Sequence, residues 1–290
     1  MTRSVVAGID GSRDSLLAAG WAAREAALRG LPLRLVHAAP VAERDDTEPP
    51  AAYTRTQAGE DLLRRAEADL AVQHAGAEVT AQQIADEPAP ALLGLADRAE
   101  LLVLGARGEG GFDGLAVGST ALATADAASC PVVIVPAGRD TPGAVPKSDA
   151  DIALGVDVRR VAEPPLDFAF EAARLRDARL RVVHAWSLSF AGPWAPLGVP
   201  EWDRATWEDE EVQRLSDVLD GRRHMNPEVP VLPDVVLLHP AYALVNASRQ
   251  AALVVVGRRS GLRTTGRRLG PVAHAVLHHA HCPVAVVPHT

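Results

Sequence analysis

A glycine-rich turn joins a short apolar run to an alanine-rich segment in the first half of the chain. Leu101–Gly108 reads LLVLGARG, nine residues follow, and Gly118–Thr120 reads GST. This order predicts a strand, a loop and the start of a helix. Glycines let the backbone approach a ligand closely, and the free N–H groups of a first helical turn favour an anion. A nucleotide is the ligand that this pattern predicts, although a lone Gly-x-x-Gly is more often a simple turn.

The chain is a tandem repeat of one domain. The matched segments are Val5–Asp10 with Ile152–Asp157, Leu33–Ala38 with Leu180–Ala185, Leu102–Gly105 with Val254–Gly257, and Cys130–Pro136 with Cys282–Pro288. The first two pairs have an offset of 147 and the last two an offset of 152. We therefore expect a net insertion of five residues in the second copy, within the loop from Ser187 to Thr206. The predicted boundaries are 1–137 for the first domain, 138–149 for a linker and 150–290 for the second domain.

Apolar runs alternate with segments of helical period within each copy. In the first copy the expected strands are Val5–Asp10, Leu33–Ala38, Glu78–Ile84, Leu101–Gly105 and Pro131–Val135. The expected helices are Ser15–Arg29, Thr56–His74, Ala89–Arg98 and Ser119–Ala127. Continuous apolar strands separated by helices are typical of an α/β fold whose parallel sheet is covered on both faces.

The loop spacing Gly-x2-Gly-x9-Gly-Ser, the chain start Val5–Ser12 and the segment Leu35–Ala38 together resemble the universal stress protein family, in its tandem, actinobacterial form. The resemblance implies an ATP-binding α/β domain for the copy that carries this loop, and an open five-stranded parallel sheet with strand order 3-2-1-4-5 in both copies. Ligands bind in such sheets at the switch point, here between the first and fourth strands. The apolar fifth strands Val132–Val135 and Val284–Val287 are then sheet edges, which invite pairing. We expect them to meet, so that the domains pack as a pseudo-dimer.

The same resemblance assigns nine residues of the first copy to an ATP site. Asp10 would contact the adenosine, Ile9 and the backbone of Ala38 would line the adenine pocket, and Gly105 would lie next to the ribose. The residues around the phosphates would be Arg107, Gly108, Gly118, Ser119 and Thr120. Mg²⁺ bridging the phosphates is implied too, although no cluster of carboxylates marks a metal site built by the protein.

Structural roles remain open for several of these residues. Asp10 could form a turn that caps the first helix, Ser119 could be only an N-cap, and Arg107 could be a solvated loop charge. His37 recurs as His184 and is interpreted as a structural histidine rather than a catalytic base.

The second copy departs from the loop pattern. Its loop reads Gly257–Ser260 (GRRS), then nine residues, then Gly270–Pro271, so that Ser260 replaces the second glycine and Pro271 replaces the helix-opening serine. Proline lacks an N–H group that a phosphate would use. The arginines of this loop could still attract anions; they are Arg258, Arg259, Arg263, Arg267 and Arg268. We expect the first domain to hold the nucleotide, and the second to act as a scaffold or to sense another ligand.

Composition limits the partners. The net charge of −8 argues against nucleic acid and against an anionic membrane surface. No apolar run approaches a membrane span and no signal pattern is present, so a cytoplasmic protein is expected. Lys147 is the only lysine, and the two cysteines, Cys130 and Cys282, are expected to be reduced and buried. The histidines between His274 and His281 have no counterpart in the first copy, which disfavours a metal site.

The leading interpretation is an ATP-binding regulatory or stress-response module that is not an efficient enzyme. The chain lacks the Gly-x4-Gly-Lys-Ser/Thr device of P-loop hydrolysis and shows no paired base and nucleophile near the loop. Two alternatives stay open: a slow ATPase or nucleotidyl-transfer enzyme on a related scaffold, and a nucleotide-free interaction scaffold. In the second case the segment from Trp186 to Trp207, which holds four of the five tryptophans, would be the partner surface. A homodimer of the whole chain also stays open.

Overall fold

The computed structural model describes residues 3–40, 51–74, 76, 78–108, 116–136, 150–186, 201–260 and 269–290. The expected linker at 138–149 lies outside these ranges, as do most of the loop from Trp186 to Trp207 and the arginines Arg263, Arg267 and Arg268. No helix in the described ranges combines the length and the apolar character that a membrane crossing requires.

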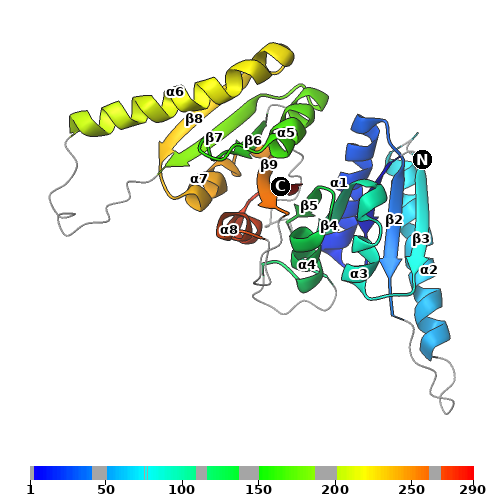
Figure 1. Cartoon of the computed structure of the whole chain (residues 1–290). Helices are drawn as coiled ribbons and strands as arrows, with labels where there is room; N and C mark the ends of the chain where they lie inside the picture. The colour runs from blue at the N-terminus through cyan, green and yellow to red at the C-terminus, as the bar shows by residue number, and fades with distance from the viewer. Residues whose placement is uncertain are drawn as a thin grey trace, which may run out of the picture.

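Each half of the chain has five strands and a set of helices between them (Figure 1). The elements of the first half are β1 (Ser4–Gly8), α1 (Arg13–Arg29), β2 (Leu33–Ala38), α2 (Ala51–Gln73), β3 (Val79–Ile84), α3 (Pro88–Leu93), η1 (Ala96–Arg98), β4 (Ala99–Gly105), α4 (Ser119–Ala127) and β5 (Val132–Val135). The second half contains β6 (Asp151–Gly155), α5 (Glu163–Leu175), β7 (Leu180–Trp186), α6 (Glu201–Met225), β8 (Val231–Leu237), α7 (Pro240–Ala247), β9 (Ala251–Arg259), α8 (Pro271–His279) and β10 (Val284–His289).

Two expected elements end earlier than the sequence suggested. The expected helix Ala89–Arg98 is instead α3 followed by the short 3₁₀ turn η1, with Gly94 between them. Glycine has a high entropic cost inside a helix, which favours a break there. The first strand ends at Gly8 rather than Asp10, because Asp10 belongs to the turn that leads into α1.

The ten strands form one continuous sheet with the order β3-β2-β1-β4-β5-β10-β9-β6-β7-β8. Each half therefore has the expected order 3-2-1-4-5, with parallel pairing inside the half. The two halves join through antiparallel pairing of β5 and β10, in which Ala285 lies opposite Val133. The prediction that the two apolar edges meet is confirmed, and the chain folds as a pseudo-dimer.

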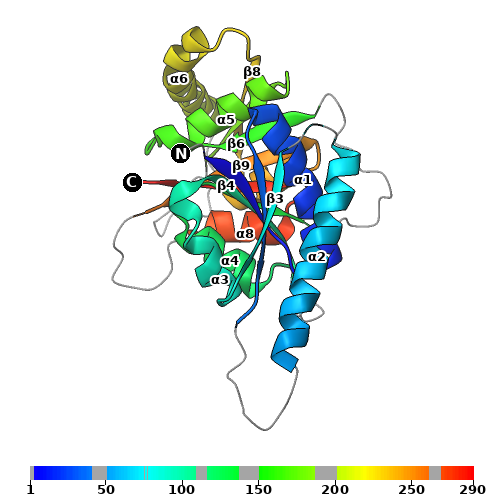
Figure 2. The ribbon, with the colours of Figure 1, turned by 90° about the vertical axis from the view of Figure 1, so that its right-hand side faces the viewer.

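The core consists of two layers, one on each face of the sheet, and each layer runs through both halves. Buried residues of α1, α2, α5 and α6 pack on one face, and those of α3, α4, α7 and α8 pack on the other. Figure 2 shows this division for the first half, with α1 and α2 on one side of the sheet and α3 and α4 on the other. Alternate strand residues, such as Val5 and Val6, face opposite layers, as the pleat requires.

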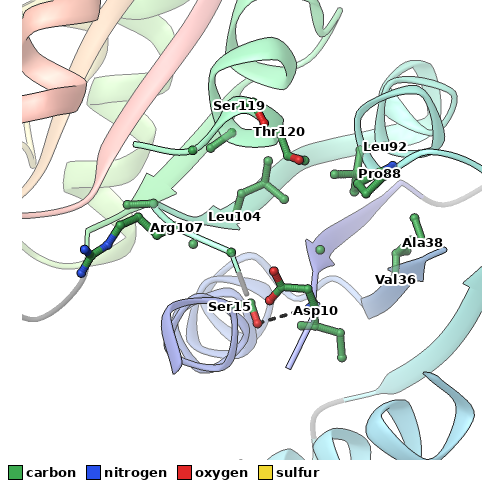
Figure 3. A pocket seen from close by; sticks show the side chains of 17 residues that line it. Asp10, Ser15, Val36, Ala38, Pro88, Leu92, Leu104, Arg107, Ser119 and Thr120 are labelled. Atoms are coloured by element: carbon green, nitrogen blue, oxygen red, sulfur yellow. Dashed lines mark hydrogen bonds between the residues drawn. The ribbon is translucent and has the colours of Figure 1, made fainter. Parts of the chain in front are cut away.

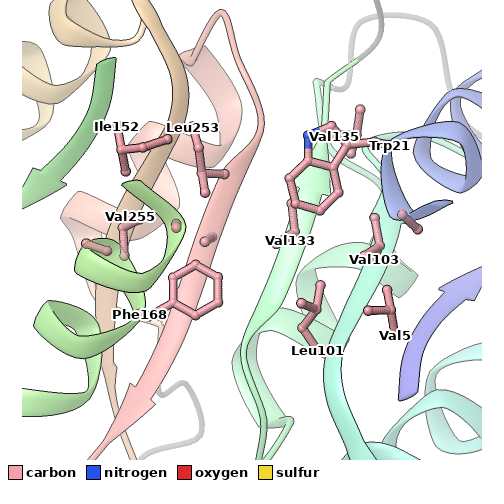
Figure 4. Packing of buried hydrophobic residues seen from close by; sticks show 14 of the residues in the cluster. Val5, Trp21, Leu101, Val103, Val133, Val135, Ile152, Phe168, Leu253 and Val255 are labelled. Carbon is pink, nitrogen blue, oxygen red and sulfur yellow. The ribbon is translucent and has the colours of Figure 1, made fainter. Parts of the chain in front are cut away.

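Aromatic side chains cover the seam between the halves. Figure 4 shows Trp21 of α1 beside Val133 and Val135 of β5, and Phe168 of α5 beside the neighbouring strand. Trp21 and Phe168 are equivalent positions of the repeat, separated by the offset of 147. The guanidinium of Arg29 lies 5.2 Å from the ring centre of Phe168. The guanidinium of Arg176, the counterpart of Arg29 in the repeat, lies 5.9 Å from the ring centre of Trp21. Each half therefore extends an arginine onto the aromatic ring of the other.

The same arginines enter a buried ionic cluster. Glu25, which is 1% exposed, accepts a 2.7 Å hydrogen bond from Arg29 and a further one from Arg176, while Arg29 also donates to Glu171 at 2.6 Å. Burial alone would lower the pKa of Arg29, but the charges of Glu25 and Glu171 raise it. Removing one member would leave a buried charge without its partner.

The two cysteines are free and buried, as expected. Burial raises the pKa of both Cys130 and Cys282 to about 12. Because the thiolate is the reactive form, we expect neither to react with an aromatic disulfide reagent at about pH 8 in the native protein, and both to react after denaturation. Absorbance of the released thiol measures this, and rapid labelling of the native protein would contradict the burial of the thiols.

Candidate functional site

A cavity of about 500 Å³ opens at the carboxyl ends of β1 and β4. These strands are neighbours in the sheet, and their following connections lead to opposite faces, so the cavity lies at the switch point of the first half. Its size is within the range of small-molecule sites.

The structure brings all nine of the predicted residues to the lining of this cavity. They are Ile9, Asp10, Ala38, Gly105, Arg107, Gly108, Gly118, Ser119 and Thr120. Eight further residues line it that the sequence did not single out: Gly8, Ser15, Val36, Pro88, Leu92, Leu104, Ala106 and Ala121. Figure 3 shows Asp10 at the bottom of the view and Thr120 at the top, with Val36 and Ala38 at the right and the side chains of Pro88 and Leu92 near Thr120.

Asp10 has a structural role as well as a place on the cavity. Its Oδ1 accepts a 3.0 Å hydrogen bond from the backbone N–H of Ser12, and its own N–H donates to Ser15 Oγ at 3.3 Å. Ser12 is the N-cap of α1 and accepts from the N–H of Ser15. The expected capping turn is therefore present. It fixes the carboxylate, whose Oδ2 lies against Gly108.

Two glycines lie close to atoms of the turn that leads into α1 and of α1 itself, Gly105 to backbone and Gly108 to a side chain. A Cβ on Gly105 would lie 2.6 Å from the backbone carbon of Asp14 and 2.7 Å from the nitrogen of Ser15. A Cβ on Gly108 would collide with the Asp10 carboxylate. Gly118 differs, because the nearest atom to its Cβ position is 3.6 Å away. A Cβ at Gly118 would make only ordinary van der Waals contacts.

The N-terminus of α4 reaches the cavity without a capping side chain. Gly118 is its N-cap and makes no side-chain cap hydrogen bond, while Ser119, Thr120 and Ala121 of the first turn line the cavity. The N–H groups of such a turn, together with the helix dipole, favour an anion. The hydroxyls of Ser119 and Thr120 are further potential donors beside it.

Comparison with known proteins decides the family. The family model described as the universal stress protein family matches residues 1–136 and 151–288. The chain belongs to the universal stress protein family. Universal stress protein Rv2005c of Mycobacterium tuberculosis is 35% identical over 294 residues, 97% of this chain and 96% of that protein. Universal stress protein Rv2623 of the same organism is 32% identical over 295 residues, 97% and 95% of the two chains.

A solved universal stress protein from Archaeoglobus fulgidus shares the fold over the whole tandem chain. Its TM-score is 0.68 at 15% identity, and the match covers 99% of this chain and 96% of that one. The two-domain universal stress protein architecture predicted from the repeat is thus confirmed.

Arg107 lines the cavity of this universal stress protein fold, but its side chain is engaged elsewhere. Its Nε lies 3.7 Å from Oδ2 of Asp14, and 42% of the side chain is exposed. Figure 3 shows its guanidinium directed away from Ser119 and Thr120. Arg107 therefore reaches an anion at the α4 N-terminus only by leaving Asp14.

The histidines that recur in the universal stress protein repeat are held by the backbone. His37 Nδ1 lies 2.9 Å from the carbonyl oxygen of Ile9, and His184 Nδ1 lies 3.1 Å from that of Val156. These contacts support the structural interpretation of both histidines. Further along the chain, the His274 and His278 rings lie 4.5 Å apart, yet no group of three metal-binding side chains exists within the described ranges.

The second half carries a cavity at the equivalent switch point, between β6 and β9, with a volume of about 720 Å³. Its lining includes Gly270 and Pro271 in place of Gly118 and Ser119. Pro271 opens α8, which likewise has no side-chain cap. The two universal stress protein domains thus share one architecture and differ in the chemistry of their cavities.

Proposed function

We propose that the first-domain cavity binds ATP and that the protein is a nucleotide-dependent regulatory module of the stress response rather than an efficient enzyme. The observation that carries the proposal is the convergence of nine residues, matched to the family motif one by one, on a single cavity at the switch point. The cytoplasmic location and the stress role expected from the sequence remain part of this proposal.

The adenosine would lie between Ile9, Ala38 and Asp10. Val36 and Leu92 add apolar surface beside Ala38, which suits the faces of a purine. The triphosphate would extend past Gly105 to the uncapped N-terminus of α4, where backbone N–H groups and two hydroxyls can donate to its oxygens. Mg²⁺ bound by the phosphates would neutralise part of their charge.

Efficient hydrolysis has little support in the lining of this cavity. Among its described residues there is no histidine and no lysine, and the one carboxylate among them, Asp10, already accepts a hydrogen bond from Ser12. A nucleophilic water would need a positioned base. Turnover of labelled ATP that disappears in Asp10→Ala would favour the slow-ATPase alternative.

Regulation requires that bound nucleotide change an equilibrium between two states. Helix α4 offers a physical connection, because its N-terminus lines the first cavity and its last turn contacts the second domain. Asp126 Oδ1 accepts a 2.6 Å hydrogen bond from the N–H of Leu269, and Arg258 donates to the carbonyl oxygen of Ala128. A shift of α4 on ligand binding would move these contacts.

Gly118→Val tests the proposal. Gly118 has φ −78° and ψ 164°, an extended conformation that valine adopts readily, and a Cβ there would make only ordinary van der Waals contacts. We expect the fold to persist while the side chain blocks the phosphate position, with about a 100-fold loss of Mg-ATP affinity from two or three lost charge-assisted hydrogen bonds. Isothermal titration calorimetry measures the affinity, and mass spectrometry identifies any nucleotide that co-purifies.

Gly270→Val is the matched control, since it makes the same change at the equivalent position of the second domain and meets nothing within 4 Å. Its ATP affinity should equal that of the wild type. Retention of wild-type affinity in Gly118→Val, or two equal ATP sites per chain, would contradict the assignment of ATP to the first cavity.

A further inference from the structure

The second cavity differs from the first near the glycine that would face a ribose. Ser260 donates its N–H to the carbonyl oxygen of His289 at 2.6 Å, and β9 and β10 stay paired up to Arg259 and His289. The equivalent pair in the first half stops at Gly105 and Val135. The His289 ring also lies 3.0 Å from the Cβ position of Gly257. Strand backbone and an imidazole therefore lie beside the glycine that would face the ribose.

The helix that follows the first strand begins later in the second half than in the first. Helix α1 begins at Arg13 behind a serine cap, whereas α5 begins at Glu163, three residues later in the repeat, and has no side-chain cap. A turn at Asp157–Arg160 replaces the missing first helical turn. The cavity is consequently larger, about 720 Å³ against 500 Å³, and it is a different site rather than a damaged copy.

Trp186, a residue with a buried and unsatisfied donor, lines this cavity. Trp186, the last residue of β7, occupies the repeat position of Ala39. It is 8% exposed, and its indole Nε1 has no hydrogen-bond partner in the described part of the chain. A buried donor without an acceptor costs about 1–3 kcal/mol, so an acceptor supplied by a ligand would recover that cost.

The charged lining is predominantly basic. It contains four arginines and one aspartate: Arg159, Arg160, Arg258, Arg259 and Asp157. Arg159 pairs with Glu211 of α6 at 2.7 Å, and the same carboxylate contacts His184 at 3.1 Å. Burial alone would raise the pKa of Glu211, but its bonds with Arg159 and His184 lower it. Arg159 thus already has a carboxylate partner, which it shares with Arg214 at 2.6 Å. Arg160 and Arg259 form no ion pair within the described ranges and remain available.

The walls between these donors are apolar. Side chains from six elements of the second half contribute: Leu154, Leu166, Val183, Leu244, Val256 and Val272. A ligand that satisfies both sets of groups has an acidic head and an apolar body. Guanidinium forks match a carboxylate in a bidentate geometry without a cradle of backbone N–H groups.

We propose that the second-domain cavity binds an organic monocarboxylate with an apolar body, held by Trp186 Nε1, Arg160 and Arg259. The assignment does not depend on ATP binding in the first domain. The carboxylate lies at the carboxyl ends of β6, β7 and β9, and the body packs on the aliphatic walls toward α7.

Calorimetric titration of the full chain with phenylacetate and with octanoate tests the proposal, with phenylacetamide as the uncharged counterpart. We expect one saturable site per chain for at least one acid and at least about tenfold weaker binding of the amide, because a hydrogen bond to a charged group is worth about 1.5–3 kcal/mol. Trp186→Phe keeps most of the aromatic volume and removes the donor. It should weaken binding of the acid about tenfold and binding of the amide by less, because the amide carbonyl oxygen is an uncharged acceptor.

Arg160→Gln provides a second variant on an exposed turn, where folding is not at stake, and should also weaken acid binding. Arg249→Gln, an exposed arginine outside the cavity, is its matched control. Absence of saturable binding by both acids, equal affinity for acid and amide, or displacement of the acid by ATP in the Gly118→Val background would each overturn the proposal. Loss of ATP binding alone would affect only the function proposed for the first domain.

Discussion

Glu25→Ala is expected to lower the free energy of unfolding by about 3–5 kcal/mol, the largest effect of any single change considered for this protein. Glu25 is buried at the seam and accepts hydrogen bonds from Arg29 and Arg176. The alanine leaves Arg29, whose side chain is 3% exposed, with Glu171 at 2.6 Å and the more distant Glu100 at 3.9 Å. Burying a charge without enough compensation is costly, whereas the intact cluster itself can be nearly neutral for stability.

Urea denaturation followed by tryptophan fluorescence measures this loss, because Trp21 lies beside the cluster. Asp61→Ala is the control: Asp61 pairs with Arg64 at 2.8 Å on the exposed surface of α2, and its removal should cost less than about 1 kcal/mol. A loss below about 1 kcal/mol for Glu25→Ala as well would show that the cluster is not desolvated.

Gly105→Ala is expected to destabilise the protein by about 3 kcal/mol. The added methyl group would meet backbone atoms of Asp14 and Ser15, so α1 must shift away from β4. Overpacking against backbone is expensive because no side-chain rotation relieves it. The shift would also move Ser15, whose hydroxyl accepts from the N–H of Asp10, and so distort the first cavity.

Gly118→Ala is the matched stability control, since its Cβ meets no atom closer than 3.6 Å and its backbone conformation suits alanine. In urea without nucleotide it should unfold within about 0.5 kcal/mol of the wild type. Equal midpoints for Gly105→Ala and Gly118→Ala would contradict the close approach of α1 to β4.

The order of strands and helices could be predicted from the sequence because the apolar runs and the segments of helical period alternate clearly along the chain. Leu33–Ala38 and Val132–Val135 are apolar runs between segments of helical period, and the structure has strands at both. The pairing of the two halves through β5 and β10 could also be predicted, because an apolar edge strand needs a partner. The 3₁₀ break after Leu93 could not be predicted in this way, because helix termination at Gly94 competes with a helical pattern on both sides.

The residues of the candidate site likewise divide into those that could be predicted from the sequence and those that could not. Residues next to strand ends, such as Asp10 and Gly105, could be placed from the motif, whereas Pro88 and Leu92 reach the cavity only because α3 packs over it. The ionic cluster was missed for a similar reason. Glu25 and Arg29 form an ordinary i,i+4 pair in sequence, and only the pairing of β5 with β10 brings Arg176 to them. The sequence groups Trp186 with the other tryptophans of the segment up to Trp207, whereas in the structure Trp186 is the last residue of strand β7.

The pairing of β5 with β10 within one polypeptide has a consequence for how the two cavities can diverge. In an assembly of identical subunits every substitution appears in both sites, so a change that suits one ligand is imposed on the other. Here a single gene encodes both partners, and covalent connection keeps them together at any dilution. Pro271 and Trp186 could therefore arise opposite an unaltered Ser119 and Ala39, which gives one molecule two cavities of different lining across a shared sheet.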